Sequence, residues 1–99
     1  MRIVEKDVMP DGTSIQMEDW SKDYPGTYAS EATIAAYPMA KRNVGGIFGP
    51  RTGELFRCAM NFPSYVQARE AFNLLSVGEK DLLDYTEFFS RPEHAGALI

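Results

Sequence analysis

Cysteine and histidine, which commonly act as nucleophiles, bases or metal ligands, each occur once in this chain of 99 residues, and they lie far apart in the sequence. The single cysteine, Cys58, falls on the inward side of a predicted strand, and the single histidine, His94, lies in a short C-terminal segment. A thiol nucleophile needs a nearby base and an exposed, electropositive setting, and a structural zinc site needs about four ligands. The sequence therefore predicts that Cys58 is a buried structural residue, and it predicts no disulfide, no metal site and no cofactor.

Two pairs of carboxylates could support acid and base catalysis if their side chains converged. Glu18 and Asp19 are adjacent on a predicted strand, where consecutive side chains point to opposite faces. Asp81 and Asp84 lie at the start of a predicted helix, where acidic residues complement the helix dipole. Because no nucleophile with its base and no cofactor motif accompanies them, the sequence predicts a protein that is not an enzyme.

Basic residues are concentrated between positions 41 and 57 of a chain whose net charge is −4. The segment contains one acidic residue, Glu54, and four basic residues: Lys41, Arg42, Arg51 and Arg57. Basic residues mixed with aromatic ones can contact phosphates while bases stack on the rings. Nucleic-acid binding through a hairpin over 41–57 is therefore one functional hypothesis. An ordinary solvated loop explains the same residues, and the glycines here lack the Lys-Ser or Lys-Thr pair of a phosphate-binding loop.

Three aromatic residues, Trp20, Tyr24 and Tyr28, lie close together in a polar segment that contains a turn at Pro25 and Gly26. Exposed aromatic side chains offer a large contact area at a low entropic cost, so these residues are the predicted partner-binding surface. The alternative interpretation is that the three rings fold inward and anchor a compact loop to the sheet.

The C-terminal helical segments carry acidic residues on their predicted outer faces, namely Glu70, Glu79, Asp84 and Glu87. A continuous negative surface could bind a basic partner, or it could act as a decoy that inhibits a nucleic-acid-binding protein. Surface solubility accounts for the same residues. A homodimer that forms by pairing of edge strands is a further possibility.

The elements that must position these residues begin with a β-hairpin. Two strand-like segments, 2–9 and 13–20, flank Pro10-Asp11-Gly12, which is typical of a tight turn. The first segment is expected at a sheet edge. Alternation in the second predicts a half-exposed strand, with Ile15 and Met17 on one face and Ser14, Gln16 and Glu18 on the other. A third strand is expected over 33–40, at an edge or bulged at Pro38, because proline cannot donate a hydrogen bond to the sheet.

The segment 54–62 alternates as a strand with one buried face and then runs directly into a helix. That helix is predicted over Tyr65–Val77, with Ser64 as its N-cap and Gly78 closing it in the left-handed conformation. A second, shorter helix is predicted from about Lys80 to Phe89.

These patterns predict one α+β domain over residues 1–92, with an antiparallel sheet of about four strands in two β-hairpins and two C-terminal helices packed on one face. Residues 93–99 are expected to form a mobile tail unless Leu98 and Ile99 dock. No apolar segment is long enough to span a membrane, and we expect a cytoplasmic protein. The leading functional hypothesis is a non-enzymatic module that binds an unknown protein partner. Nucleic-acid binding is the second hypothesis, and decoy inhibition is the third.

Overall fold

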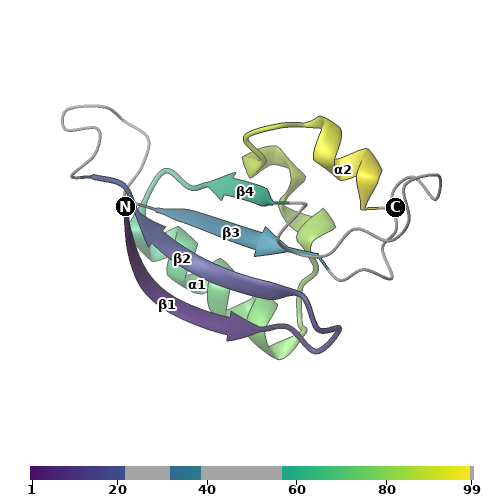
Figure 1. Ribbon diagram of the computed structural model, residues 1–99, viewed down its shortest axis with the longest axis horizontal. Coiled ribbons are helices and arrows are strands. Elements are labelled where there is room, and N and C mark those ends of the chain that lie inside the picture. The colour runs from purple at the N-terminus through teal and green to yellow at the C-terminus, as the bar shows by residue number, and fades with distance from the viewer. Residues whose placement is uncertain (22–31, 39–56, 99) are drawn as a thin grey trace.

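The computed structural model describes residues 1–21, 32–38 and 57–98, which form an antiparallel sheet followed by helices (Figure 1). The strands are β1 (Arg2–Val8), β2 (Ser14–Asp19), β3 (Thr33–Tyr37) and β4 (Cys58–Asn61), and they lie in the order β1-β2-β3-β4. The helices are α1 (Tyr65–Val77), a 3-10 helix named η2 (Leu82–Phe88) and α2 (Glu93–Ala97). The predicted α+β arrangement is therefore confirmed.

The β1-β2 hairpin turns at the predicted tripeptide. The backbone N–H of Met9 donates to Thr13 O over 2.8 Å, and Gly12 N donates to Met9 O over 2.8 Å. Gly12 has a positive φ of 93°, a conformation that a glycine adopts without steric cost. The Asp11 carboxylate also accepts a hydrogen bond from Thr13 N. β1 lies at the sheet edge, as predicted, with an irregular register between Ile3 and Glu5.

The prediction for the third strand was wrong about its place in the sheet. β3 lies between β2 and β4 and pairs with both, so it is not an edge strand. The strand ends at Tyr37, one residue before Pro38, so the proline interrupts no pairing of β3. Residues 39 and 40 of the predicted strand lie outside the described residues.

One face of the sheet packs against α1, and this contact forms the hydrophobic core (Figure 1). Alternate residues of β2, β3 and β4, including Met17, Ile34 and Met60, are fully buried in it. α1 contributes Ala68, Ala71, Phe72 and Leu75, which share one face of the helix. Each large side chain buried in this layer contributes roughly 1.5–3 kcal/mol to folding.

Cys58 belongs to the same buried layer, as predicted. Burial raises the pKa of its thiol to about 12, because the thiolate would lose its hydration inside the core. At neutral pH the side chain therefore remains a protonated, apolar packing group.

Both ends of α1 are as predicted. The Ser64 hydroxyl accepts a hydrogen bond from the backbone N–H of Gln67 over 3.2 Å, and this satisfies one free donor of the first turn. Gly78 closes the helix with a φ of 79°. No helix in the described ranges is long and apolar enough to cross a membrane.

The second predicted helix exists, but it is a 3-10 helix that begins later and has a kink at Tyr85. Asp81 caps its start, and the Asp84 carboxylate accepts the backbone N–H of Asp81 in return. Just beyond the helix, Phe89 bridges to Met60, and Ser90 N donates to Ala59 O over 2.9 Å. These contacts cover the outer edge of β4.

Residues 93–97 of the predicted C-terminal tail form the short helix α2. Leu98 then docks into the hydrophobic core, with 4% of its surface exposed. The described part of the tail is therefore held by the docking of Leu98, which was the stated alternative to a mobile tail.

The helix cap generates the first prediction. At Gly78 an added Cβ would lie 2.8 Å from Pro10 Cγ, and alanine tolerates the positive φ poorly, so Gly78→Ala should lower the free energy of unfolding by about 1–3 kcal/mol. Gly96→Ala is the matched control, because an added Cβ there meets nothing within 4 Å. Thermal unfolding should show a fall in Tm of roughly 4 °C or more for the first variant only. Equal Tm values for the two variants would contradict the packing of Pro10 against Gly78.

Candidate functional site

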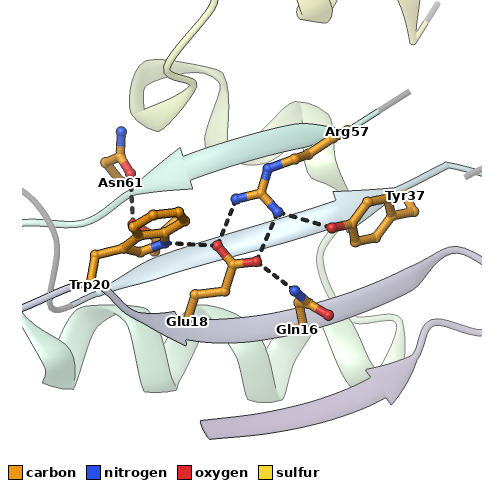
Figure 2. A network of polar contacts seen from close by, with 7 residues as sticks. Gln16, Glu18, Trp20, Tyr37, Arg57 and Asn61 are labelled. Carbon is orange, nitrogen blue, oxygen red and sulfur yellow. Dashed lines mark hydrogen bonds and ion pairs between the residues drawn. The ribbon is translucent and has the colours of Figure 1, made fainter. Parts of the chain in front are cut away.

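Two of the predicted site residues, Trp20 and Arg57, are in the described part of the chain, and they meet on the sheet face opposite α1 (Figure 2). The other predicted site residues lie outside the described residues: Tyr24, Tyr28, Lys41, Arg42 and Arg51. What brings Trp20 and Arg57 together is the carboxylate of Glu18, to which both donate hydrogen bonds.

Strand geometry explains this meeting. Ile15 and Met17 of β2 point toward α1, so Glu18 points to the opposite face of the sheet. Arg57 lies immediately before β4, and its guanidinium reaches across β3 to the Glu18 carboxylate. The two nitrogens Nη1 and Nη2 donate to Oε2 and Oε1 over 2.8 Å and 2.6 Å, which is a bidentate ion pair.

Further donors complete the network around this carboxylate. Trp20 Nε1 donates to Glu18 Oε1 over 2.9 Å, and Gln16 Nε2 donates to Oε2. Arg57 Nη1 also donates to the Tyr37 hydroxyl over 2.9 Å. The network therefore joins β2, β3 and the start of β4 through side chains alone (Figure 2).

Glu18 lies on the face opposite Ile15 and Met17, as the alternation predicted, but its side chain is fully buried rather than exposed. Burial alone would raise the pKa of this carboxyl, but the hydrogen bonds from Arg57, Gln16 and Trp20 outweigh it and hold the pKa below its usual value. Hydrogen bonding to Glu18 likewise raises the pKa of Arg57. The sequence showed the strand alternation, but it gave no sign of a partner 39 residues away.

Hydrogen bonds within the network use donor groups of Arg57 and Trp20 that a ligand would otherwise contact. Arg57 directs both terminal nitrogens to Glu18, so its positive charge is balanced inside the protein. The indole N–H of Trp20 is directed to the same carboxylate. Among the described residues, the polar contacts on this face therefore hold neighbouring strands together.

A different surface has the shape of a binding site. A hollow of about 150 Å³ lies between α1 and η2, and six of the described residues line it: Phe62, Gln67, Glu70, Ala71, Tyr85 and Phe88. Gln67, Glu70 and Ala71 are three and four positions apart on α1, so they share one face of that helix. The hollow therefore has a polar wall from α1 and an aromatic wall from Phe62 and η2.

The aromatic wall is a cluster of three rings. Phe62 directly follows β4 and is almost fully buried, and the ring of Phe88 stacks on it with centroids 4.5 Å apart. Tyr85 meets Phe62 edge-on at 5.9 Å. Phe62 holds the two other rings in place, while Tyr85 and Phe88 remain half-buried.

The electrostatic character of this hollow is negative. Glu70 is the one carboxylate among its described lining residues, and none of those residues is basic. Burial first, and then the charges of Asp84 and Glu70, raise the pKa of the Tyr85 hydroxyl. Glu70 and Asp84 were predicted to lie on an acidic outer face, but the rings beside them were missed. The spacing of three between Tyr85 and Phe88 was the available signal.

A second hollow, of about 230 Å³, lies beside the β1-β2 turn, where Pro10 faces Gly78. It has charges of both signs, from Lys80 and from Asp11 and Asp81, so it favours no single class of ligand. In the ranges that the structure describes, no group of three or more His, Cys, Asp or Glu side chains could hold a metal ion.

Comparison of the chain with models of known protein families, with curated proteins and with solved structures found no match.

The ion pair generates a prediction about stability. Arg57→Met would leave the Glu18 carboxylate buried with Gln16 and Trp20 as its donors among the described residues, so the free energy of unfolding should fall by about 2–4 kcal/mol. Glu18→Leu combined with Arg57→Met should recover most of this loss, because no buried charge then remains. Urea unfolding of the single and double variants measures both values. A double variant less stable than Arg57→Met alone would contradict the account.

The same carboxylate generates a prediction about pH. In the wild type the pKa of Glu18 is below its usual value of 4.5, so its contribution to stability is present above that pH and is lost as the pH falls. In Arg57→Met burial should dominate and raise this pKa, so protonation should then favour the folded state. The difference in free energy of unfolding between the two proteins should therefore shrink from pH 7 to pH 4. A constant difference across this range would show that Glu18 is not the group involved.

Proposed function

We propose that this chain is a non-enzymatic protein-interaction module that binds its partner at the hollow between α1 and η2. The observation that carries the proposal is the pair of half-buried rings, Tyr85 and Phe88, fixed by the buried ring of Phe62 at the wall of that hollow. Aromatic side chains held rigidly at a concave surface are typical centres of protein interfaces, because they add contact area with little loss of entropy.

The size of the hollow supports a protein ligand. Sites for small molecules and cofactors usually have volumes of roughly 300–1,000 Å³, which is well above the 150 Å³ found here. A hollow of this size suits one side chain of a larger partner, whose remaining contacts would lie on the surrounding surface of α1 and η2.

The chemistry of the described residues gives less support to the alternatives. Nucleic-acid binding depends on Lys41, Arg42 and Arg51, which lie outside the described residues, and on Arg57, which is paired with Glu18. Decoy inhibition would need an extended negative surface. The support for it is the group of acidic residues on and near η2, such as Asp84 and Glu87. The net charge of −4 opposes non-specific binding to nucleic acid.

The charge pattern of β1 disfavours a homodimer through the outer edge of this strand in the described sheet. Glu5 and Asp7 pair with residues of β2 that face α1, whereas Lys6 pairs with Gln16 of the opposite face. Two-fold antiparallel pairing centred between Glu5 and Asp7 places Glu5 opposite Glu5, Glu5 opposite Asp7, or Asp7 opposite Asp7. Like charges directly opposite each other are destabilising, so each of these registers is unfavourable.

Selection of peptides tests the proposal without a known partner. Random peptides displayed on phage would be selected against wild-type protein, and the enriched peptides measured against variants. Phe88→Ala should weaken their binding about tenfold or more, because it removes one wall of the hollow. Glu70→Arg changes an exposed lining residue and should also weaken binding in a folded protein. Val66→Ala is the control, since Val66 is 74% exposed on α1 and does not line the hollow.

Peptides that bind wild type and Phe88→Ala equally, or no enrichment at all, would contradict the proposal. Retention of oligonucleotides that is lost at high salt, and lost when Arg42→Glu is combined with Arg51→Glu, would favour nucleic-acid binding instead. Trp20→Ala should leave such retention unchanged.

A further inference from the structure

We infer that the hollow between α1 and η2 receives the guanidinium group of an arginine from a basic segment of the partner. This inference rests on the proposed function, and it adds the chemical identity of the side chain that is bound. Three features of the hollow lead to it: its capacity, its aromatic wall and its carboxylate.

The capacity of the hollow limits the ligand to one side chain. At about 150 Å³ the hollow is well below the usual size of a small-molecule site, so it suits one side chain of a partner. A long, thin side chain such as arginine could enter it while its polar end reached the wall of α1.

The aromatic wall favours a cation. The ring faces of phenylalanine and tyrosine have negative quadrupoles, which attract a guanidinium within about 6 Å of the ring centroid. Phe88 and Tyr85 line the hollow and both are half-buried, while the ring of Phe62 covers one face of Phe88. Partial burial strengthens the attraction, because less of the cation remains hydrated.

The carboxylate wall favours the same ligand. Glu70 lines the hollow, no described lining residue is basic, and Asp84 adds negative charge near Tyr85. Burial raises the pKa of the Tyr85 hydroxyl, and the charges of Asp84 and Glu70 raise it further. A cation bound here would therefore meet rings on one side and a carboxylate on the other.

The chain itself contains this arrangement elsewhere on α1. The guanidinium carbon of Arg69 lies 5.8 Å from the Tyr65 ring and 5.9 Å from the Phe72 ring. Arg69 Nη1 also donates to the Glu5 carboxylate over 3.0 Å. Arg69 Nη2 donates to the Tyr65 hydroxyl over 3.0 Å as well. Two aromatic rings, a tyrosine hydroxyl and a carboxylate thus hold this arginine. The hollow likewise has aromatic rings, one of them a tyrosine, and a carboxylate, without a cation among its described lining residues.

Arginine fits this set of groups better than lysine does. Its guanidinium is planar, is more weakly hydrated than an ammonium, and can stack on a ring while its N–H groups donate to a carboxylate. We therefore expect the hollow to prefer arginine to lysine.

A small-molecule titration tests the inference. Nα-acetyl-arginine N-methylamide would be added to isotope-labelled wild-type protein at low salt, and chemical shifts of Tyr85, Phe88 and Ala71 recorded by NMR. Binding should be in the millimolar range, and the citrulline analogue, which has nearly the same shape without the charge, should bind at least about fivefold more weakly. The lysine and norleucine analogues complete the series.

Variants locate the site. Glu70→Gln should weaken binding of the arginine probe by about threefold, because one opposing charge is lost. Glu79→Gln is the matched control, since Glu79 is also an exposed acidic residue but does not line the hollow. Gln67→Arg should also weaken binding, because an arginine at this lining position would compete for the hollow.

The outcomes separate the two proposals. Equal binding of arginine and citrulline would overturn the inference, and so would tighter binding of lysine. If norleucine shifted the same resonances while arginine did not, the hollow would still bind a partner, but through an apolar side chain. If no probe shifted these resonances and no selected peptide depended on Phe88, both the inference and the proposed function would fail.

Discussion

A sheet of four strands has two faces, and α1 covers only one of them (Figure 1). This constraint explains much of the described structure. The face under α1 is built from apolar side chains, and its core continues to η2 and Leu98. The opposite face is held by polar contacts, in which the Glu18 carboxylate joins side chains from β2 and from the start of β4 (Figure 2). A buried carboxylate is costly unless its donors are complete, so this network specifies the arrangement of the strands rather than offering free groups to a ligand.

The hollow follows from the way η2 meets the rest of the core. Phe89 and Ser90 attach the end of η2 to the outer edge of β4, while Leu82 at its start is buried in the core. Between these two attachments the half-buried rings of Tyr85 and Phe88 lie against Phe62, and they leave space beside the exposed Glu70 of α1. The same contacts that close the sheet edge therefore create a rigid aromatic wall next to a carboxylate. Rigid walls favour binding, because little side-chain entropy remains to be lost.

Local sequence signals predicted the fold well. Alternation of residues located the strands, and Ser64 and Gly78 located the ends of α1, because capping depends on nearby residues alone. The errors arose at residues whose position or burial depends on contacts with residues distant in the sequence. Pro38 suggested an edge, yet β3 is central and simply ends before it. Glu18 was expected on the polar face of a half-exposed strand, and its burial depends above all on Arg57, a partner distant in sequence. The hollow was missed because its rings come from β4's end and from η2, and no local pattern reports that these two segments meet.

Binding of a protein partner between α1 and η2 is tested most directly by intermolecular nuclear Overhauser effects. The measurement uses the wild-type chain, isotope-labelled, in complex with a selected peptide that contains arginine. We expect contacts between the arginine side-chain protons and the ring protons of Tyr85 and Phe88. Contacts confined to Trp20 and the strands around Glu18, with none to these two rings, would contradict the assignment of this hollow as the binding site.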